Sequence, residues 1–326
     1  MSINTTSLIH SRRGRYLIYP AAAVVLIQTL AAHAFLLSAY NGFQLNDPLI
    51  PKAEIHHGGP PRDGIPAIDK PGFIKAGRVD YLQGEDRVLG IVRHGVAKAY
   101  PIKILNYHEI VNDDINAEPI VVTYCPLCGT GVAFSAVAAG EARSFGVSGL
   151  LYNSDVLLYD RQTESLWSQI LGQAISGPLK GERLRRIALA HTTWADWRNR
   201  HGDTLVLSQH TGYRRDYSRD PYAGYENNGK IIFPVKRVDP RYHPKERVIG
   251  LEIDGRYKVY PFVELARTPA AVSDTFAGRS IRIVFDAKHR TGRVVDADGN
   301  EIPSIIAYWF AWIAFHPDTE VYRPAN

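Results

Sequence analysis

Two cysteines, Cys125 and Cys128, are the residues of this chain best suited to chemistry. They are the only cysteines among 326 residues, and they stand in the run YCPLCGTG that begins at Tyr124. Thiols three positions apart can chelate a metal ion, switch between dithiol and disulfide, or form a structural disulfide in an oxidising compartment. The helix that usually follows the first cysteine of a redox site is not indicated, because Gly129 and Gly131 intervene. All three interpretations stay open.

A metal site at this pair needs further ligands. A closed tetrahedral zinc site requires two beyond the thiolates, and the chain has no second cysteine pair. Histidine is the expected partner, and imidazole together with thiolate also suits copper. We expect a copper or zinc ion held by Cys125 and Cys128 with at least one of His57, His108 and His289.

A second group of polar residues lies downstream, in a segment of about 143–186 that alternates polar groups with apolar stretches. Its candidate binding residues are Asn153, Asp155, Asp160 and Arg161, which we expect to face the thiols. The alternative is that they form ordinary hydrogen-bonded turns. No catalytic residue is assigned, because the Gly-x-Ser-x-Gly elbow of a serine hydrolase is absent and Ser148 stands one residue short of that spacing.

The N-terminal segment predicts where these groups work. Residues 16–40 contain no Asp, Glu, Lys or Arg and are long enough to cross a bilayer. Arg12, Arg13 and Arg15 precede them, which predicts a cytoplasmic N-terminus and a single-pass protein of the cell membrane with its C-terminal body in the periplasm. A cleaved signal peptide, with the processing site at 32–34, is the alternative.

An internal repeat predicts the elements that position the site. Residues 86–105 and 246–265 match at eight of twenty positions without a gap, and each copy reads as a β-hairpin with an x-Gly turn followed by a short helix. After a further strand, Cys125 and Cys128 align with Asp286 and His289, and each copy ends in a Trp-rich helix. We therefore predict an α+β fold of two pseudo-symmetric β-rich units with short helices, preceded by one N-terminal transmembrane helix.

The predicted organisation follows from this repeat. It comprises a cytoplasmic N-terminus 1–15, a transmembrane anchor or uncleaved signal 16–40, a Gly/Pro-rich lead-in 41–85, a first repeat unit 86–210 with the insert 143–186, a linker or lid 211–245, and a second repeat unit 246–326. The net charge is +5, and the basic residues outside the N-terminus are scattered. We expect no nucleic-acid partner, because no basic patch is interleaved with aromatic residues.

Four segments carry a resemblance to a known family: 54–67, 124–129, 145–155 and 160–169. They resemble the hallmarks of a bacterial domain-of-unknown-function family, number 3179, and the likeness runs from about Glu54 to Tyr322. The Cys-Pro-x-Cys pattern of that family is intact at Cys125 and Cys128. The resemblance implies an exported location and the extent of the domain, and it implies no reaction.

Two classes of function remain. The first is a membrane-anchored extracytoplasmic protein whose thiol pair binds copper or zinc or does thiol redox chemistry. The second is an extracytoplasmic module that binds a small molecule or carbohydrate and carries a structural disulfide. Aromatic residues of the lid segment, among them Tyr213, Tyr217 and Tyr222, are available to line a cleft for such a ligand. Metal in the purified protein would indicate the first class, and thermal stabilisation by an added ligand would indicate the second.

Overall fold

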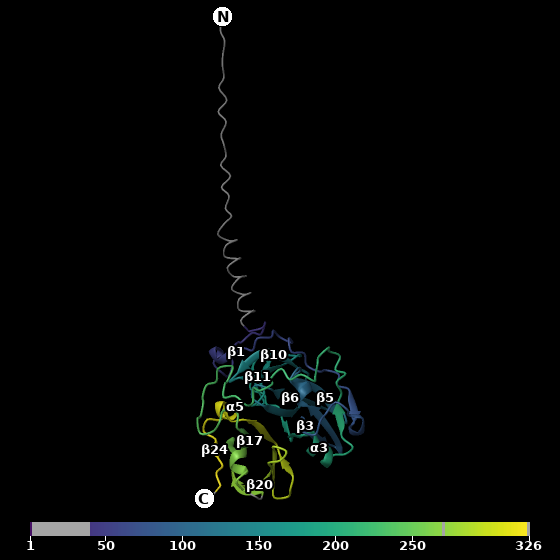
Figure 1. The fold of residues 1–326 in the computed structure, drawn as a ribbon. Coiled ribbons are helices and arrows are strands. Elements are labelled where there is room, and N and C mark those ends of the chain that lie inside the picture. Colours follow the sequence, from purple (N-terminus) through teal and green to yellow (C-terminus); the bar gives the residue numbers. More distant parts are fainter. Residues whose placement is uncertain (2–39, 269–270, 325–326) are drawn as a thin grey trace.

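The structure, a computed structural model, describes Met1, residues 40–268 and residues 271–324 (Figure 1). The regular secondary structure of the described part is mostly β-strand, and its larger sheets are five of four or five strands, arranged like the blades of a propeller. The predicted α+β class is therefore wrong. The described helices are single or double turns, too short to form a layer over a sheet, so the sheets pack on one another and on the loops.

Two sheets are centred on the hairpins that the repeat predicts. The β3 sheet has the order β15 (Ala190–Thr193), β3 (Arg87–Arg93), β4 (Val96–Pro101), β16 (Leu205–Leu207), β2 (Phe73–Lys75). The β17 sheet has the order β23 (Ser304–Tyr308), β17 (Arg247–Ile253), β18 (Arg256–Pro261), β24 (Glu320–Val321). Both hairpins are confirmed, with Val88 opposite Pro101 in one and Val248 opposite Pro261 in the other.

Two further sheets follow these hairpins in the chain. The β6 sheet has the order β14 (Arg186–Ile187), β7 (Thr130–Ser135), β6 (Glu118–Cys125), β5 (Ile110–Ile115). The β20 sheet has the order β19 (Val272–Phe276), β20 (Arg279–Asp286), β21 (Thr291–Val295), β22 (Glu301–Ile302). The repeated segments of each predicted unit are thus divided between two separate sheets, and the strands of the insert belong to neither.

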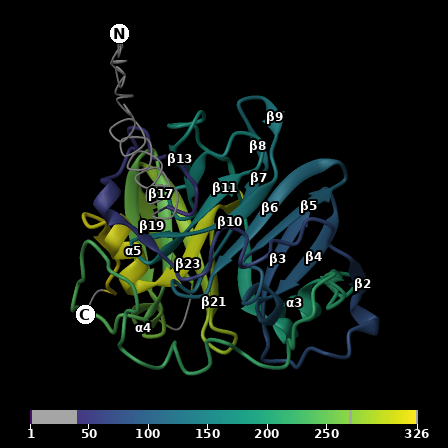
Figure 2. The ribbon, with the colours of Figure 1, turned by 90° about the horizontal axis from the view of Figure 1, so that it is seen from above.

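The fifth sheet departs most from the expected two units. The β10 sheet has the order β1 (Ile55–His57), β10 (Phe145–Tyr152), β11 (Asp155–Asp160), β12 (Leu166–Ser168), β13 (Gln173–Ser176). A strand of the lead-in covers the edge of strands from the insert, so these two segments build one sheet. Figure 2 shows β10 and β23 near the middle of the body, with β17 on one side and β3 to β6 on the other. A small hairpin, β8 (Val137–Ala138) with β9 (Glu141–Ala142), adds to the rim.

Local sequence explains the tight turns of the two repeated hairpins. His94 and Gly95 have φ of 50° and 75°, and Asp254 and Gly255 have 51° and 75°. Two successive positive φ angles define the turn that matches the twist of a two-residue hairpin, and glycine takes the second position without strain.

The described helices are four α-helices and two 3-10 turns. They are α2 (Ile102–Leu105), α3 (Trp194–Arg200), α4 (Phe262–Leu265), α5 (Trp309–Phe315), η1 (Lys52–Glu54) and η2 (Ala76–Arg78). The two longer ones, α3 and α5, are the predicted Trp-rich helices. Trp197 packs on Gly90 of β3, and Trp312 packs on Gly250 of β17, where a Cβ atom would come within 2.3 Å and 2.1 Å of the rings. The repeated glycines therefore leave room for the repeated tryptophans.

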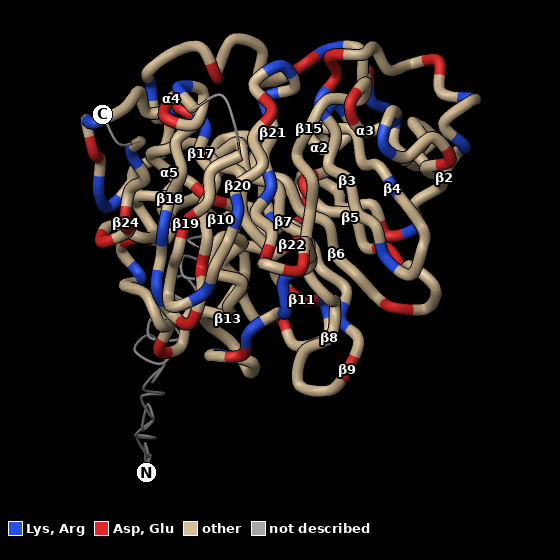
Figure 3. The backbone as a smooth tube through the Cα atoms, turned by 90° about the horizontal axis from the view of Figure 1, so that it is seen from below, with Lys and Arg blue, Asp and Glu red and all other residues tan. Residues whose placement is uncertain are grey.

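The predicted membrane segment and the predicted lid lie outside the described sheets. The predicted membrane segment 16–40 lies outside the described residues, apart from Tyr40. Within the described ranges, the helices are too short or too polar to span a bilayer. The segment expected as a lid, 211–245, has no helix or strand and runs over the body between β16 and β17. Figure 3 shows Lys and Arg interspersed with Asp and Glu along the chain.

Candidate thiol and carboxylate site

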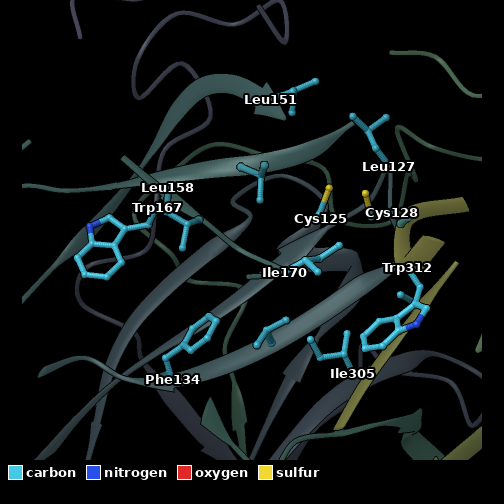
Figure 4. Close-up of a cluster of buried hydrophobic side chains, with 14 of the residues drawn as sticks. Cys125, Leu127, Cys128, Phe134, Leu151, Leu158, Trp167, Ile170, Ile305 and Trp312 are labelled. Carbon is cyan, nitrogen blue, oxygen red and sulfur yellow. The ribbon is translucent and has the colours of Figure 1, made fainter. Parts of the chain in front are cut away.

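The two cysteines lie at the β6–β7 hairpin. Cys125 is the last residue of β6 and pairs with Thr130, the first residue of β7. Cys128 sits in the intervening turn, which closes through Gly129 at a φ of 59°. Both side chains are buried, with 1% and 0% exposure, and both are free thiols. Figure 4 shows the two sulfur atoms side by side, with Leu127 and Ile170 nearby.

A second hairpin brings an acid to these thiols. Asn153 and Ser154 turn the chain from β10 into β11 with φ of 51° and 65°, and Asp155 follows as the first residue of β11. The Sγ atoms of Cys125 and Cys128 lie 3.8 Å and 3.3 Å from the Ser154 carbonyl oxygen, to which they donate. The sulfur atoms and a carboxylate oxygen of Asp155 all lie within 4.8 Å of one another.

The Asp155 carboxyl group is only half satisfied. Its Oδ2 accepts a hydrogen bond of 3.1 Å from the backbone N–H of Ile170. Its Oδ1 is buried and has no hydrogen-bond partner among the described residues, and the same holds for the hydroxyl of the preceding Ser154. A buried polar atom without a partner is costly, so this pocket favours a proton or a cation beside Asp155.

Burial dominates the electrostatics of the cluster. It raises the pKa of Asp155 to about 7 and raises the pKa of both thiols, that of Cys128 most strongly. Without a cation, the thiols are therefore protonated at neutral pH, and protonated thiols are poor nucleophiles. A metal ion reverses this preference, because it replaces the protons and stabilises the thiolates.

Glu109 is an acidic residue of this region that no sequence pattern indicated. Glu109 is 7% exposed, has a φ of 57°, and stands between α2 and β5. Burial, reinforced by the charge of Asp155, raises its pKa to about 8. It borders a cavity of about 200 Å³ with Leu127, Tyr222 and other mostly apolar residues. Only the folded structure shows that Glu109 is buried here, because a single glutamate before a strand is common in sequences and predicts no site.

The histidines expected as ligands lie elsewhere. His57, at the end of β1, accepts a hydrogen bond from the Gly59 N–H through Nδ1. Both ring nitrogens of the buried His108 are engaged, with the Pro66 carbonyl at 2.7 Å and the Tyr217 hydroxyl at 2.6 Å. His289 belongs to a separate group with Asp286 and Asp196. Among the described residues, the group that surrounds the thiols contains Asp155 and no histidine.

The other expected binding residues also have structural partners. Asn153 accepts from the Lys236 N–H at 2.8 Å and donates to the Ala314 carbonyl at 3.2 Å, so it joins three segments. Asp160 accepts from the indole N–H of Trp167 at 2.9 Å and closes its own turn through Thr163. Arg161 reaches toward Asp69 with an N–O distance of 3.2 Å. Of the four, Asp155 is the one that the structure brings to the thiols.

The group around His289 is built differently. The His289 Nδ1 and an Asp286 carboxylate oxygen are 2.7 Å apart, and Asp196 forms an ion pair with Arg200 at 2.6 Å. These side chains lie where α3 meets the β20–β21 turn, and Asp286 and Asp196 also border a cavity of about 190 Å³. Each carboxylate already has a hydrogen-bond or ion-pair partner, and among the described residues neither has the buried unsatisfied oxygen found at Asp155.

Comparison with known proteins places the chain in a family. Residues 62–319 match the family described as protein of unknown function (DUF3179), which covers most of the chain. The protein therefore belongs to the DUF3179 family, as its sequence motifs indicated. No curated protein and no solved structure matches the chain.

Proposed function

We propose that this protein is a membrane-anchored extracytoplasmic protein that holds one thiophilic metal ion, zinc or copper, at Cys125, Cys128 and Asp155. The observation that carries the proposal is the unpartnered Oδ1 of Asp155 beside two fully buried free thiols. An ion bound there satisfies this oxygen and compensates the burial of all three groups.

The donor set selects among metal ions. Two thiolates and one carboxylate suit zinc, which accepts both sulfur and oxygen ligands in tetrahedral geometry and would keep one position for a further ligand. Copper(I) prefers soft sulfur donors, so the two thiolates would hold it with little help from the carboxylate. Hard ions such as magnesium and calcium prefer oxygen ligands and do not fit a site that is mainly sulfur.

Thiol redox chemistry is the second candidate. The observation that favours it is the closeness of the two sulfur atoms, together with a neighbouring acid whose pKa of about 7 suits proton transfer. In this reaction the two thiols lose two electrons and two protons to a disulfide substrate, which becomes two thiols. Metal binding is the better-supported proposal, because reactive thiols are usually partly exposed with a lowered pKa, whereas these are buried with a raised pKa.

The location belongs to the same proposal and rests on the sequence. The arginines before the apolar segment 16–40 support a cytoplasmic N-terminus and a periplasmic body. Reporter fusions at the C-terminus test it: activity of a periplasmic reporter supports this topology, and activity of a cytoplasmic reporter alone refutes it.

Metal content tests the site itself. The chain purified without chelator is analysed beside the Cys125→Ser/Cys128→Ser double variant and Asp155→Asn, with the exposed Asp254→Asn as the matched control. We expect about one equivalent of zinc or copper in the parent and the control and none in the double variant. Loss of metal in Asp155→Asn indicates zinc, and its retention indicates copper(I). Equal metal in parent and double variant, or none in a parent whose thiols are oxidised, overturns the metal proposal.

A further inference from the structure

Two arginines at equivalent places in the repeat carry buried guanidinium nitrogen atoms, although Arg87 as a residue is only half-buried. Arg87 and Arg247 are 160 residues apart and begin β3 and β17, respectively. Arg247 is 6% exposed. Arg87 forms its β-ladder pair with Thr193, and Arg247 with Tyr308. The two arginines are identical in the aligned repeat, but the repeat alone gives no reason for a cation at either position.

The partners of Arg87 are mainly backbone carbonyl groups. Its Nη1 donates to the His289 carbonyl at 2.7 Å, and its Nη2 donates to the His191 carbonyl at 2.8 Å and to that of Arg290 at 3.2 Å. Its Nε is buried without a partner among the described residues. These bonds position the guanidinium group but leave its positive charge without a carboxylate in contact.

Arg247 has fewer partners still. Its Nη2 donates to Glu226 at 2.7 Å, while Nε and Nη1 are buried without partners in the described part of the chain. The guanidinium carbon lies 5.5 Å from the centre of the Tyr308 ring. Glu226 is shared with Arg290, whose Nη1 lies 3.2 Å from the other carboxylate oxygen. One carboxylate is therefore shared by two arginines, Arg247 and Arg290, while Arg87 has none in contact.

His191 completes the group from β15. It is 1% exposed, and both ring nitrogens lack partners among the described residues. Its ring meets that of Tyr124 edge to face at 6.0 Å, and its backbone carbonyl is the one that binds Arg87. Burial, with repulsion by Arg87, Arg247 and Arg290, holds the pKa of His191 well below its usual range, so the ring is neutral and offers one N–H donor.

All but one of the unsatisfied atoms of this group are hydrogen-bond donors, the exception being the unprotonated ring nitrogen of His191, which accepts. Arg87 Nε and Arg247 Nε and Nη1 can only donate hydrogen bonds, and the neutral His191 ring supplies one donor more. Burying several donors and an excess of positive charge is costly unless an acceptor of opposite charge is present. Guanidinium groups match the oxygen pairs of carboxylates and phosphates in geometry as well as in charge.

We propose that Arg87, Arg247 and His191 form a binding site for one small oxyanion of the phosphate or sulfate type. The site is separate from the thiols: Tyr124 faces it, whereas the next residue of β6, Cys125, turns to the other side of the strand. It is therefore independent of the proposed metal site.

Thermal unfolding with added inorganic phosphate tests the site. Chloride at equal ionic strength is the reference, because a specific ligand stabilises the native state in a saturable manner and ionic screening does not. For the parent chain we expect a saturable rise in melting temperature with phosphate, and one equivalent bound in equilibrium dialysis. Arg247→Lys keeps the charge but loses the planar fork, and we expect it to weaken phosphate binding at least tenfold. The exposed Arg279→Lys is the matched control and should bind as the parent does.

The outcomes decide the proposal even if one variant fails to fold. If Arg247→Lys does not fold, phosphate binding is measured with Arg87→Lys, for which we expect the same tenfold loss of affinity. The stoichiometry of phosphate bound to the parent chain is then the second measurement. A parent chain that gains no more stability from phosphate or sulfate than from chloride overturns the proposal. Equal binding by the parent chain and by the folded arginine variants also overturns it, since the oxyanion then binds elsewhere.

Discussion

Tyr124 and Cys125 are consecutive residues of β6 whose side chains enter different environments. The Tyr124 ring packs against His191 at 6.0 Å, on the side of Arg87, which donates to the His191 carbonyl. The Cys125 sulfur faces Cys128 and Asp155, in a different hydrophobic cluster. Because successive side chains of a strand point to opposite faces, one strand end serves both sites without joining them.

The first prediction concerns this separation. The Cys125→Ser/Cys128→Ser double variant should lose the bound metal and keep phosphate-induced stabilisation within twofold of the parent, because Cys125 and Tyr124, which packs on His191, point to opposite faces of β6. Arg247→Lys should show the reverse. Metal analysis and phosphate titration of both variants check it. Loss of both ligands in a folded variant would indicate a single shared site.

The second prediction concerns the contact between Gly250 and Trp312. A Cβ atom at Gly250 would stand 2.1 Å from the indole ring, so Gly250→Ala must displace a fully buried tryptophan from the core. We expect a loss of about 3 kcal/mol in the free energy of unfolding, at the upper end for overpacked cores. Gly202→Ala is the control, since no atom lies within 4 Å of its Cβ position. Denaturant unfolding measures both, and equal stability of the two variants would contradict the prediction.

The repeat also shows what the sequence can predict. Lys98 and Tyr100 recur as Lys258 and Tyr260, and in both copies the pair binds one aspartate of the following strand: Asp113 in the first and Asp274 in the second. The hairpins and Trp-rich helices were predictable because their signals are local. The identical residues reflect this shared packing and hydrogen bonding. They predict two units, whereas the described part of the chain forms five sheets of four or five strands and one small hairpin.

The site was less accessible to sequence reasoning. The thiol pair is visible in the sequence because cysteine is otherwise absent, and Asp155 stood among four polar candidates. Glu109 and the unpartnered oxygen of Asp155 depend on the packing of the β10 sheet against the β6–β7 hairpin, which no local pattern encodes. His108 looked available for a metal, but tertiary contacts with Pro66 and Tyr217 occupy both of its nitrogens.

The third prediction concerns Lys245, which holds the long segment between β16 and β17. Its buried ammonium group donates to the carbonyls of Tyr225, Asn228 and Lys230 at 2.6, 2.7 and 2.8 Å. Lys245→Met removes these bonds and leaves the carbonyls unsatisfied, so residues 225–230 should open more often. We expect chymotrypsin to cleave near Tyr225 at least tenfold faster than in the parent chain. The exposed Lys230→Met is the control, and unchanged cleavage in both would disprove the role of Lys245.

The fourth prediction concerns His316 and pH. The ring is 5% exposed, stacks on Tyr257 with centres 3.9 Å apart, and packs against Trp312 of α5. Burial, with a smaller contribution from the charge of Arg186 on β14, lowers the pKa of His316 to about 3. In the unfolded chain a histidine titrates near pH 6.5.

The sign of the pH effect follows from proton binding. Between pH 6.5 and about 3 the unfolded state takes up a proton that the folded state refuses, so stability falls as the pH falls. The slope approaches about 1.4 kcal/mol per pH unit, which gives a loss of roughly 1.5 kcal/mol between pH 6.5 and 5. The buried His191, whose pKa is also lowered, contributes in the same direction. Carboxylates with a lowered pKa, such as Glu118 with about 2, lose their contribution at more acidic pH. Asp155 and Glu109, whose pKa is raised to about 7 and about 8, act in the opposite direction between pH 6.5 and 5, so the contribution of His316 is read from the difference between the parent chain and a His316 variant.

The test compares His316→Gln with the parent chain. Urea unfolding at pH 6.5 and 5 should show a parent that loses roughly 1.5 kcal/mol more than the variant, because glutamine binds no proton in either state. The exposed His210→Gln serves as the control and should follow the parent chain. If His316→Gln and the parent lose the same free energy over this range, the neutral His316 does not contribute to the acid sensitivity of the fold.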